Sequence, residues 1–127
     1  LVHGSDSAVD SQITELKKYP GVSKIQVAKN DSLDNAYGQC VALIAQNLIE
    51  ANGYDNVIAA SSSFGKDVVP RIGGLMDLQA ITDIIQIKDG GKQFVRPIYA
   101  GNALCTVSTS DKIKLMTVRG TNFEKVP

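Results

Sequence analysis

The first part of the chain alternates between apolar residues at helical spacing and short β-branched runs. Val9, Ile13 and Leu16 lie three or four residues apart, as on one face of a helix. The pattern predicts helices over Ala8–Tyr19, Asn35–Asn52 and Lys66–Leu78, and strands over Lys24–Ala28 and Asn56–Ala60. Helices that alternate with strands indicate parallel strands joined by right-handed crossovers.

The segment Asn35–Asn52 has the clearest helical pattern. Its apolar stripe is formed by Tyr37, Val41, Ile44 and Leu48. We expect Val41, Ile44 and Leu48 to be buried against the sheet. The strand that follows, residues 56–60, is short and continuously apolar, which is typical of a strand covered on both faces.

The pattern changes after residue 80, where strand-like segments follow one another without a helix between them. They are Ile81–Lys88, Phe94–Tyr99, Leu104–Ser108 and Ile113–Arg119, and turn residues separate them. We therefore predict an antiparallel meander from Ile81 onward. The predicted fold class is α/β: a Rossmann-like parallel sheet covered by helices, with a C-terminal antiparallel strand extension.

Composition narrows the possible functions. The 127 residues suit one domain, and 13 basic residues balance 13 acidic ones. We therefore expect no nucleic-acid partner, and the absence of a long apolar run argues against membrane insertion. Cys40 and Cys105 are predicted to be reduced core thiols, and His3 a solvated loop residue. No spacing in the sequence predicts a metal site.

The loop Ser61–Lys66 lies between a predicted buried strand and a helix, where open α/β sheets bind ligands. Its hydroxyl groups, Gly65 and Lys66 are the elements of a phosphate cradle. The run lacks the spacing of a Walker or dinucleotide motif. The alternative is a tight strand-to-helix turn that packs against a neighbour.

Three arginines, Arg71, Arg96 and Arg119, are candidate anchors for a subunit or domain interface. Arginine suits this role because its planar guanidinium binds carboxylates through two hydrogen bonds. The alternative is a local salt bridge for each. Asp83 lies in an apolar run and needs a donor such as a nearby arginine. No acid, base and nucleophile set accompanies it, so we predict no catalytic residues.

Four segments resemble the α subunit of electron transfer flavoproteins in sequence, order and spacing. They are Ser61–Arg71 (SSSFGKDVVPR), Ala80–Ile84 (AITDI), Arg96–Ala103 (RPIYAGNA) and Val118–Phe123 (VRGTNF). Together they extend over most of the chain from Asn56 onward, whereas the earlier part matches only in the order of its elements.

This resemblance implies an electron carrier subunit, not an enzyme. It implies a heterodimer with a β subunit that carries AMP, and flavin adenine dinucleotide (FAD) held mainly by a separate C-terminal α-subunit domain. It implies electron transfer from acyl-CoA and related dehydrogenases to a membrane quinone oxidoreductase. The expected location is the mitochondrial matrix in a eukaryote and the cytoplasm in a bacterium.

The sequence departs from the complete family pattern at both ends. Leu1-Val2 resembles the end of a strand, and no glycine-rich flavin segment is present. We therefore expect residues 1–127 to be an N-terminally truncated α/β domain without the flavin-binding domain, which binds no cofactor and serves as scaffold and docking surface. A free-standing nucleotide-binding module using Ser61–Lys66, and a small enzyme with a site beside the meander, are the alternatives.

Overall fold

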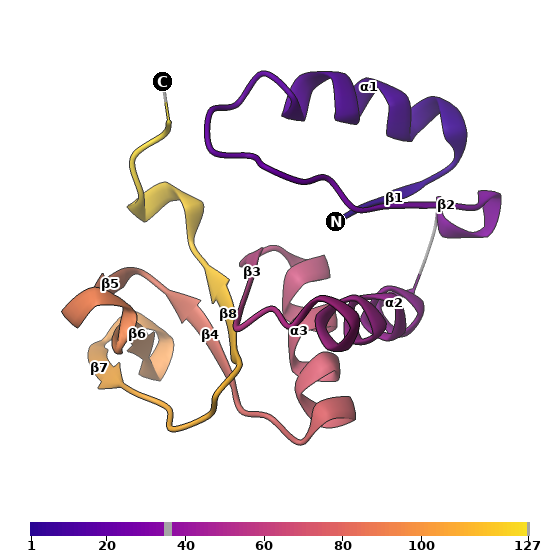
Figure 1. Cartoon of the computed structure of the whole chain (residues 1–127). Helices are drawn as coiled ribbons and strands as arrows, with labels where there is room; N and C mark the ends of the chain where they lie inside the picture. Colours follow the sequence, from indigo (N-terminus) through magenta and orange to yellow (C-terminus); the bar gives the residue numbers. More distant parts are fainter. Residues whose placement is uncertain (35–36, 127) are drawn as a thin grey trace.

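A computed structural model describes residues 1–34 and 37–126 of the chain. Its strands form three groups: a parallel pair, a parallel sheet of three strands, and an antiparallel sheet of three strands. Figure 1 shows the antiparallel sheet on one side of the parallel three-stranded sheet, and two helices on the other side. The predicted α/β class, with a parallel sheet and an antiparallel extension, is confirmed.

The N-terminal unit consists of β1 (Val2–Gly4), α1 (Asp6–Leu16) and β2 (Val27–Lys29). Its two strands are parallel, with Val2 opposite Val27. The prediction for His3 was wrong: it lies in β1, and its ring centroid is 5.5 Å from that of Phe64. Packing on an aromatic ring explains its position, because an imidazole ring has apolar faces.

The central sheet contains β3 (Asn56–Ala60), β8 (Lys114–Val118) and β4 (Ala80–Ile84), in that order and all parallel. Helices α2 (Gly38–Asn52) and α3 (Ser63–Met76) pack together against it, and Val69, Ile72 and Leu115 are buried in their common core. Ser62 caps α3, so this helix begins three residues before the predicted start. The first two residues of the predicted helix Asn35–Asn52 lie outside the described residues.

The position of β8 corrects the predicted meander. Residues 113–119 were expected to extend an antiparallel sheet, but β8 returns to the middle of the parallel sheet. Leu115, Met116 and Thr117 are each at most 2% exposed because the strand is covered on both faces. The prediction that residues 113–119 pair with the preceding strand was wrong, because the chain leaves the parallel sheet after β4, forms the antiparallel sheet, and returns with β8 to pair with β3 and β4.

The prediction that β3 is covered on both faces was wrong. Within the described residues β3 pairs only with β8, and Ile58 is 56% exposed. Val57 and Ala59 pack against the helices, whereas Ile58 points to the opposite face. A continuous apolar run therefore did not distinguish an edge strand from a central one.

The buried face of α2 also differs from the predicted stripe. Val41, Ala42 and Ile49 are buried, whereas Ile44 and Leu48 are half-buried. Tyr37 precedes the first helical residue and is 83% exposed. Gly38 and Ala42 explain part of the difference: both are buried, and a Cβ on Gly38 would meet the Asp67 side chain of α3, so α2 and α3 lie close together at this end. Cys40 is exposed on this helix, which contradicts its predicted core position.

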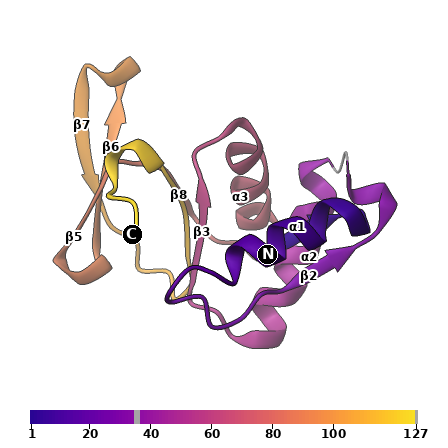
Figure 2. The ribbon, with the colours of Figure 1, turned by 90° about the horizontal axis from the view of Figure 1, so that it is seen from above.

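The antiparallel sheet contains β5 (Gln86–Lys88), β6 (Gln93–Ile98) and β7 (Ala103–Val107). Phe94 of β6 is 1% exposed and packs on the far face of the central sheet, against Ile84 and Met116. Beyond Phe94 the β6–β7 hairpin projects away from the rest of the molecule (Figure 2). We call residues 96–105 the arm.

Candidate functional site

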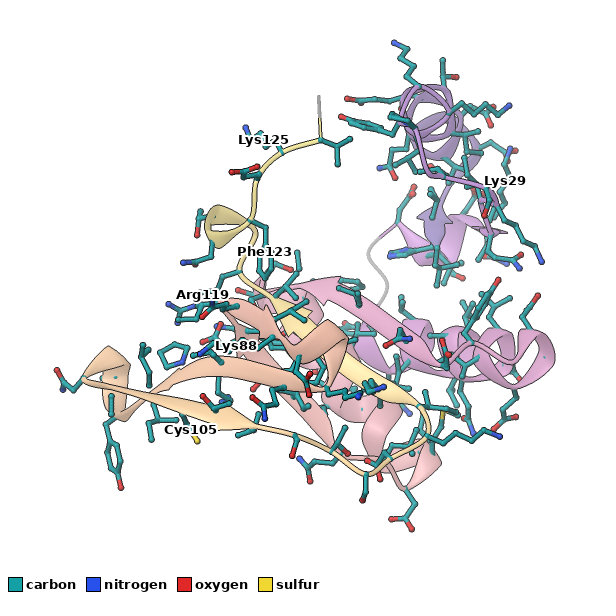
Figure 3. The ribbon with its side chains drawn as sticks, turned by 60° about the vertical axis from the view of Figure 1, so that its left-hand side comes forward. Lys29, Lys88, Cys105, Arg119, Phe123 and Lys125 are labelled. Atoms are coloured by element: carbon teal, nitrogen blue, oxygen red, sulfur yellow. The ribbon has the colours of Figure 1, made fainter. Side chains whose placement is uncertain are left out.

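The carboxyl ends of β3, β4 and β8 meet at one edge of the central sheet. Asp83 lies near the end of β4, Arg119 directly follows β8, and Ser61 directly follows β3. Figure 3 shows Arg119 in the segment that leaves β8, near Phe123. This edge is where open parallel sheets place functional groups.

Asp83 and Arg119 form a bidentate ion pair. The Nε and Nη2 atoms of Arg119 donate to the two carboxylate oxygens of Asp83 at 3.0 and 2.8 Å. The Nζ atom of Lys66 lies 3.5 Å from the same carboxylate. The pKa of Asp83 is lowered to about 2, chiefly by the hydrogen bonds from Arg119, and the charges of Arg119 and Lys66 contribute in the same direction while desolvation opposes them.

The backbone at Asp83 is held in an unusual conformation. Its φ is +65°, in the left-handed region, where β4 has a register shift between Ile81 and Ile84. The Asp83 N–H donates to the hydroxyl of buried Thr117 at 2.9 Å, and the Ser61 hydroxyl lies 3.0 Å from the same oxygen. These bonds and the ion pair fasten the end of β4 to β8 and so compensate the strain, which is of the order of 1–2 kcal/mol.

The loop Ser61–Lys66 is a tight turn in this structure. The Ser62 hydroxyl accepts the Gly65 N–H at 3.1 Å and so caps α3. A Cβ atom on Gly65 would clash with the carbonyl oxygen of Ala60, so glycine lets α3 start directly against the end of β3. Lys66 already faces Asp83. The Ser62 hydroxyl and the Lys66 ammonium group therefore have partners within the chain, as the alternative of a tight strand-to-helix turn expects.

Arg96 braces β6 against β4. Its Nε donates to the carbonyl oxygen of Thr82 at 2.8 Å, and its Nη2 lies 3.2 Å from the Thr82 hydroxyl. Arg119 binds Asp83, the residue after Thr82, so Arg96 and Arg119 both contact β4. Both have partners within the chain.

Arg71 lies apart from the other two arginines, on α3. Its Nε donates to Asp67 one helical turn earlier at 2.7 Å, and the two side chains are about half exposed. It lines a shallow groove of about 300 Å³ beside Leu43 and Leu75. The exposed pair is worth little stability, because solvent screens it. Whether any of the three arginines contacts a partner stays a prediction.

A family model described as "Electron transfer flavoprotein domain" matches residues 1–127, the whole chain. The chain belongs to the electron transfer flavoprotein family. The segments that resembled this family in the sequence contain Asp83, Arg96 and Arg119, so the β4 contacts are built from the family-like residues.

Similar proteins carry the names of α subunits. The chain is 37% identical over 129 residues to "Electron transfer flavoprotein subunit alpha, mitochondrial" of Arabidopsis thaliana, covering 100% of this chain and 35% of that protein. It is 41% identical over 106 residues to the protein of the same name from Oryza sativa subsp. japonica, covering 83% and 29%. It is 36% identical over 127 residues to the probable α subunit of Cryptococcus neoformans var. grubii, covering 98% and 37%. The chain thus spans about a third of these relatives.

Two large side chains on the arm are exposed, although the sequence pattern did not predict it. Tyr99 is 80% exposed and Leu104 66% exposed, both on the arm. The family-like segment Arg96–Ala103 includes Tyr99, but β patterning alone gave no reason to expect its side chain in solvent. The sequence did contain one signal: Tyr99 and Ala100 occupy positions of a hairpin turn where Asn or Gly is usually favoured.

Other candidate chemistry is not evident in the described part of the chain. No group of three or more His, Cys, Asp or Glu residues there is placed to hold a metal ion. Cys40 and Cys105, both described, are free thiols. A search of the described residues also found no helix long and apolar enough to cross a membrane.

Proposed function

We propose that this chain is the scaffold and subunit-docking domain of the α subunit of a heterodimeric electron transfer flavoprotein. The observation that carries the proposal is the arm, which presents Tyr99 and Leu104 to solvent at the end of a projecting hairpin. The family placement supports it, because the similar proteins are named α subunits.

The turn at the tip of the arm supports a role for Tyr99 itself. Tyr99, Ala100 and Gly101 have φ values of +49°, +53° and +89°. Asp89, Gly90 and Gly91 between β5 and β6 have φ values of +49°, +59° and +87°. The chain thus builds the same turn twice, but on the arm non-glycine residues occupy both leading positions. Such residues are strained in this conformation, and strain kept at an exposed aromatic residue favours a functional explanation.

The exposed side chains suit a protein partner. Tyrosine is enriched among the residues that dominate binding energy, because it buries a large rigid surface at low entropic cost. In the described structure β7 is hydrogen-bonded only to β6, so its other edge has no strand partner. Of the three arginines, Arg71 supports docking best, since it is half exposed and lies beside a groove with apolar side chains.

The complete protein is proposed to accept electrons from acyl-CoA and related dehydrogenases and to pass them to a membrane quinone oxidoreductase. We place FAD mainly in the C-terminal part of the α subunit and AMP in the β subunit, with no cofactor in this domain. The domain is then part of an electron carrier and not an enzyme. We propose the mitochondrial matrix in a eukaryote and the cytoplasm in a bacterium.

The docking role is tested by changing Tyr99→Ala in the complete α subunit and measuring its affinity for the β subunit by calorimetry. Loss of an interface anchor typically costs about 2 kcal/mol, so we expect a loss of about 30-fold or more. Tyr37→Ala is the matched control, because Tyr37 is 83% exposed and lies outside the arm. Arg71→Ala, Arg96→Ala and Arg119→Ala extend the test, with subunit stability measured in parallel. Unchanged affinity in Tyr99→Ala would contradict docking through the arm.

A further inference from the structure

The register of the antiparallel sheet fixes which backbone groups of β7 face away from β6. Pro97 of β6 lies opposite Leu104 and has no N–H, so these two residues cannot exchange a pair of hydrogen bonds. Val95 lies opposite Thr106, and its carbonyl oxygen accepts the N–H of Ile85 on the other side of β6 at 2.9 Å. Both observations place Leu104 and Thr106 in non-hydrogen-bonded pairs. Their N–H and C=O groups therefore point to the outer edge of β7.

These outward backbone groups are open to solvent in the described part of the chain. No described strand pairs with the outer edge of β7, and no backbone hydrogen bond of the described residues reaches Leu104 or Thr106 across it. The Thr106 carbonyl oxygen receives a weak contact from the thiol of Cys105 at 4.0 Å. Leu104 is 66% exposed, and Thr106 is exposed as well. The N–H and C=O groups of these two residues can therefore bind an incoming strand.

The outer edge of β7 lacks the features that usually block strand addition. Folded proteins protect edge strands with charged residues, prolines, bulges or very short strands. β7 has five residues in unbroken register with β6, and the sequence NALCTVSTS at positions 102–110 contains no charged residue and no proline. The opposite edge of the same sheet is β5, which has three residues and ends at Lys88. The sheet is thus protected at β5 and open at β7.

We propose that the outer edge of β7 adds an extended, uncharged strand of the β subunit, so that the antiparallel sheet continues across the subunit interface. Backbone hydrogen bonds to Leu104 and Thr106 hold this strand, as in other complexes formed by strand addition. Leu104 and Pro97 lie on one face of the sheet, and an apolar residue of the added strand covers them there. The edge favours an uncharged strand, because residues 102–110 offer no charge to pair with a buried one.

The β subunit is the occupant because the open edge is continuous with the docking surface proposed above. Leu104 belongs both to the arm and to the outer edge of β7, and Figure 2 shows the hairpin projecting from the molecule. The similar proteins are named α subunits, which implies a complex with a different subunit. The inference rests on the proposed function and adds how the partner binds. The competing occupant is a second copy of this chain, paired β7 to β7.

Amide hydrogen exchange in the complete α subunit tests the inference without a variant. The amides of Leu104 and Thr106 are followed with the α subunit alone and then with the β subunit added. We expect both amides to exchange about 100-fold slower or more in the complex, because each then donates to the added strand. The Cys105 amide points to β6 and is the internal reference, protected in both samples.

A matched pair of variants at Thr106 tests the same edge through affinity. Thr106→Pro removes one outward N–H and places a ring at the edge, whereas the bonds from β7 to β6 come from the neighbouring residues and stay. We expect the affinity of the complete α subunit for the β subunit to fall about tenfold or more, the effect of one lost hydrogen bond. Thr106→Val keeps the N–H and a similar shape, so its affinity should stay within about twofold.

Three results would overturn the inference. Equal affinities of Thr106→Pro and Thr106→Val would show that the edge is not used. Protection of both amides in the α subunit alone would mean that the edge is already paired, and its dependence on α-subunit concentration would identify a second copy. Fast exchange of both amides in the complex would mean that the arm binds through side chains only, and a loss of affinity in Tyr99→Ala would then still support the proposed function. If Tyr99→Ala binds normally while both amides become protected, strand addition stands and the anchor role of the Tyr99 side chain fails.

Discussion

Breaking the ion pair between Asp83 and Arg119 is the sharpest test of how the carboxyl ends of β4 and β8 are held together. The perturbation is Asp83→Asn, because Asn tolerates the left-handed φ of +65°, removes the charge and leaves only one of the two acceptor oxygens that bind Arg119. The pKa of Asp83 falls from 3.8 to about 2 in the folded chain. One unit corresponds to about 1.4 kcal/mol, so the shift represents roughly 2 kcal/mol. Arg119 is 45% exposed, and solvent screening reduces the expected loss on substitution to about 1–2 kcal/mol.

The pH dependence follows from the direction of the shift. The pKa of Asp83 is lower in the folded state than in the unfolded state, so its contribution is present above the unfolded pKa. It is lost as pH falls from about 4 to about 2. The stability of Asp83→Asn should therefore approach that of the unchanged chain at about pH 2 and differ most at neutral pH.

Urea unfolding of both proteins between neutral pH and about pH 2 measures this difference. Arg119→Met is the companion variant, because it keeps much of the apolar stem and removes the charge. The double variant should be little less stable than Asp83→Asn, since both changes remove the same interaction. A loss at neutral pH below about 0.3 kcal/mol, or a difference that does not change with pH, would refute the account of the ion pair.

Two further predictions concern glycine positions and the α2 core. Gly65→Ala should destabilise the chain by about 1–3 kcal/mol in thermal unfolding, because its Cβ would meet the Ala60 carbonyl oxygen. Gly74→Ala is the matched control: its Cβ would have open space, so the helix should be stabilised by about 0.5–1 kcal/mol. Equal effects of the two substitutions on stability would contradict the close approach at Gly65. Ile49→Ala should lower the free energy of unfolding in urea by about 2–5 kcal/mol, and Leu48→Ala by clearly less, because Ile49 is 3% exposed and Leu48 is half-buried. A larger loss for Leu48→Ala would show that the apolar stripe predicted from the sequence, which includes Leu48, faces the core.

The alternation of helices and strands was sufficient to predict the α/β class and the bounds of β3. Local patterns succeed there because helix periodicity and turn residues act within a few positions of the chain. They failed for β8, whose pairing depends on residues more than thirty positions away. They also failed for Ile58, because an apolar side chain has the same sequence pattern at an edge as in a covered strand.

The candidate site was predicted only in part. The need of Asp83 for a donor was evident from its apolar surroundings, and Arg119 is that donor. The exposure of Tyr99 was not evident, because it depends on the projection of the arm and not on local sequence. The three arginines were predicted as a group, but only the structure separates the brace at Arg96 from the exposed Arg71.

Sedimentation of residues 1–127 mixed with the β subunit, recorded at protein and flavin absorbance together, tests the central claim most directly. The account predicts that the chain sediments alone without flavin absorbance and shifts to a faster boundary with the β subunit. No shift with the β subunit would contradict its role as a docking domain. A chain that sediments alone with stoichiometric flavin would contradict the assignment of the cofactor to another part of the protein.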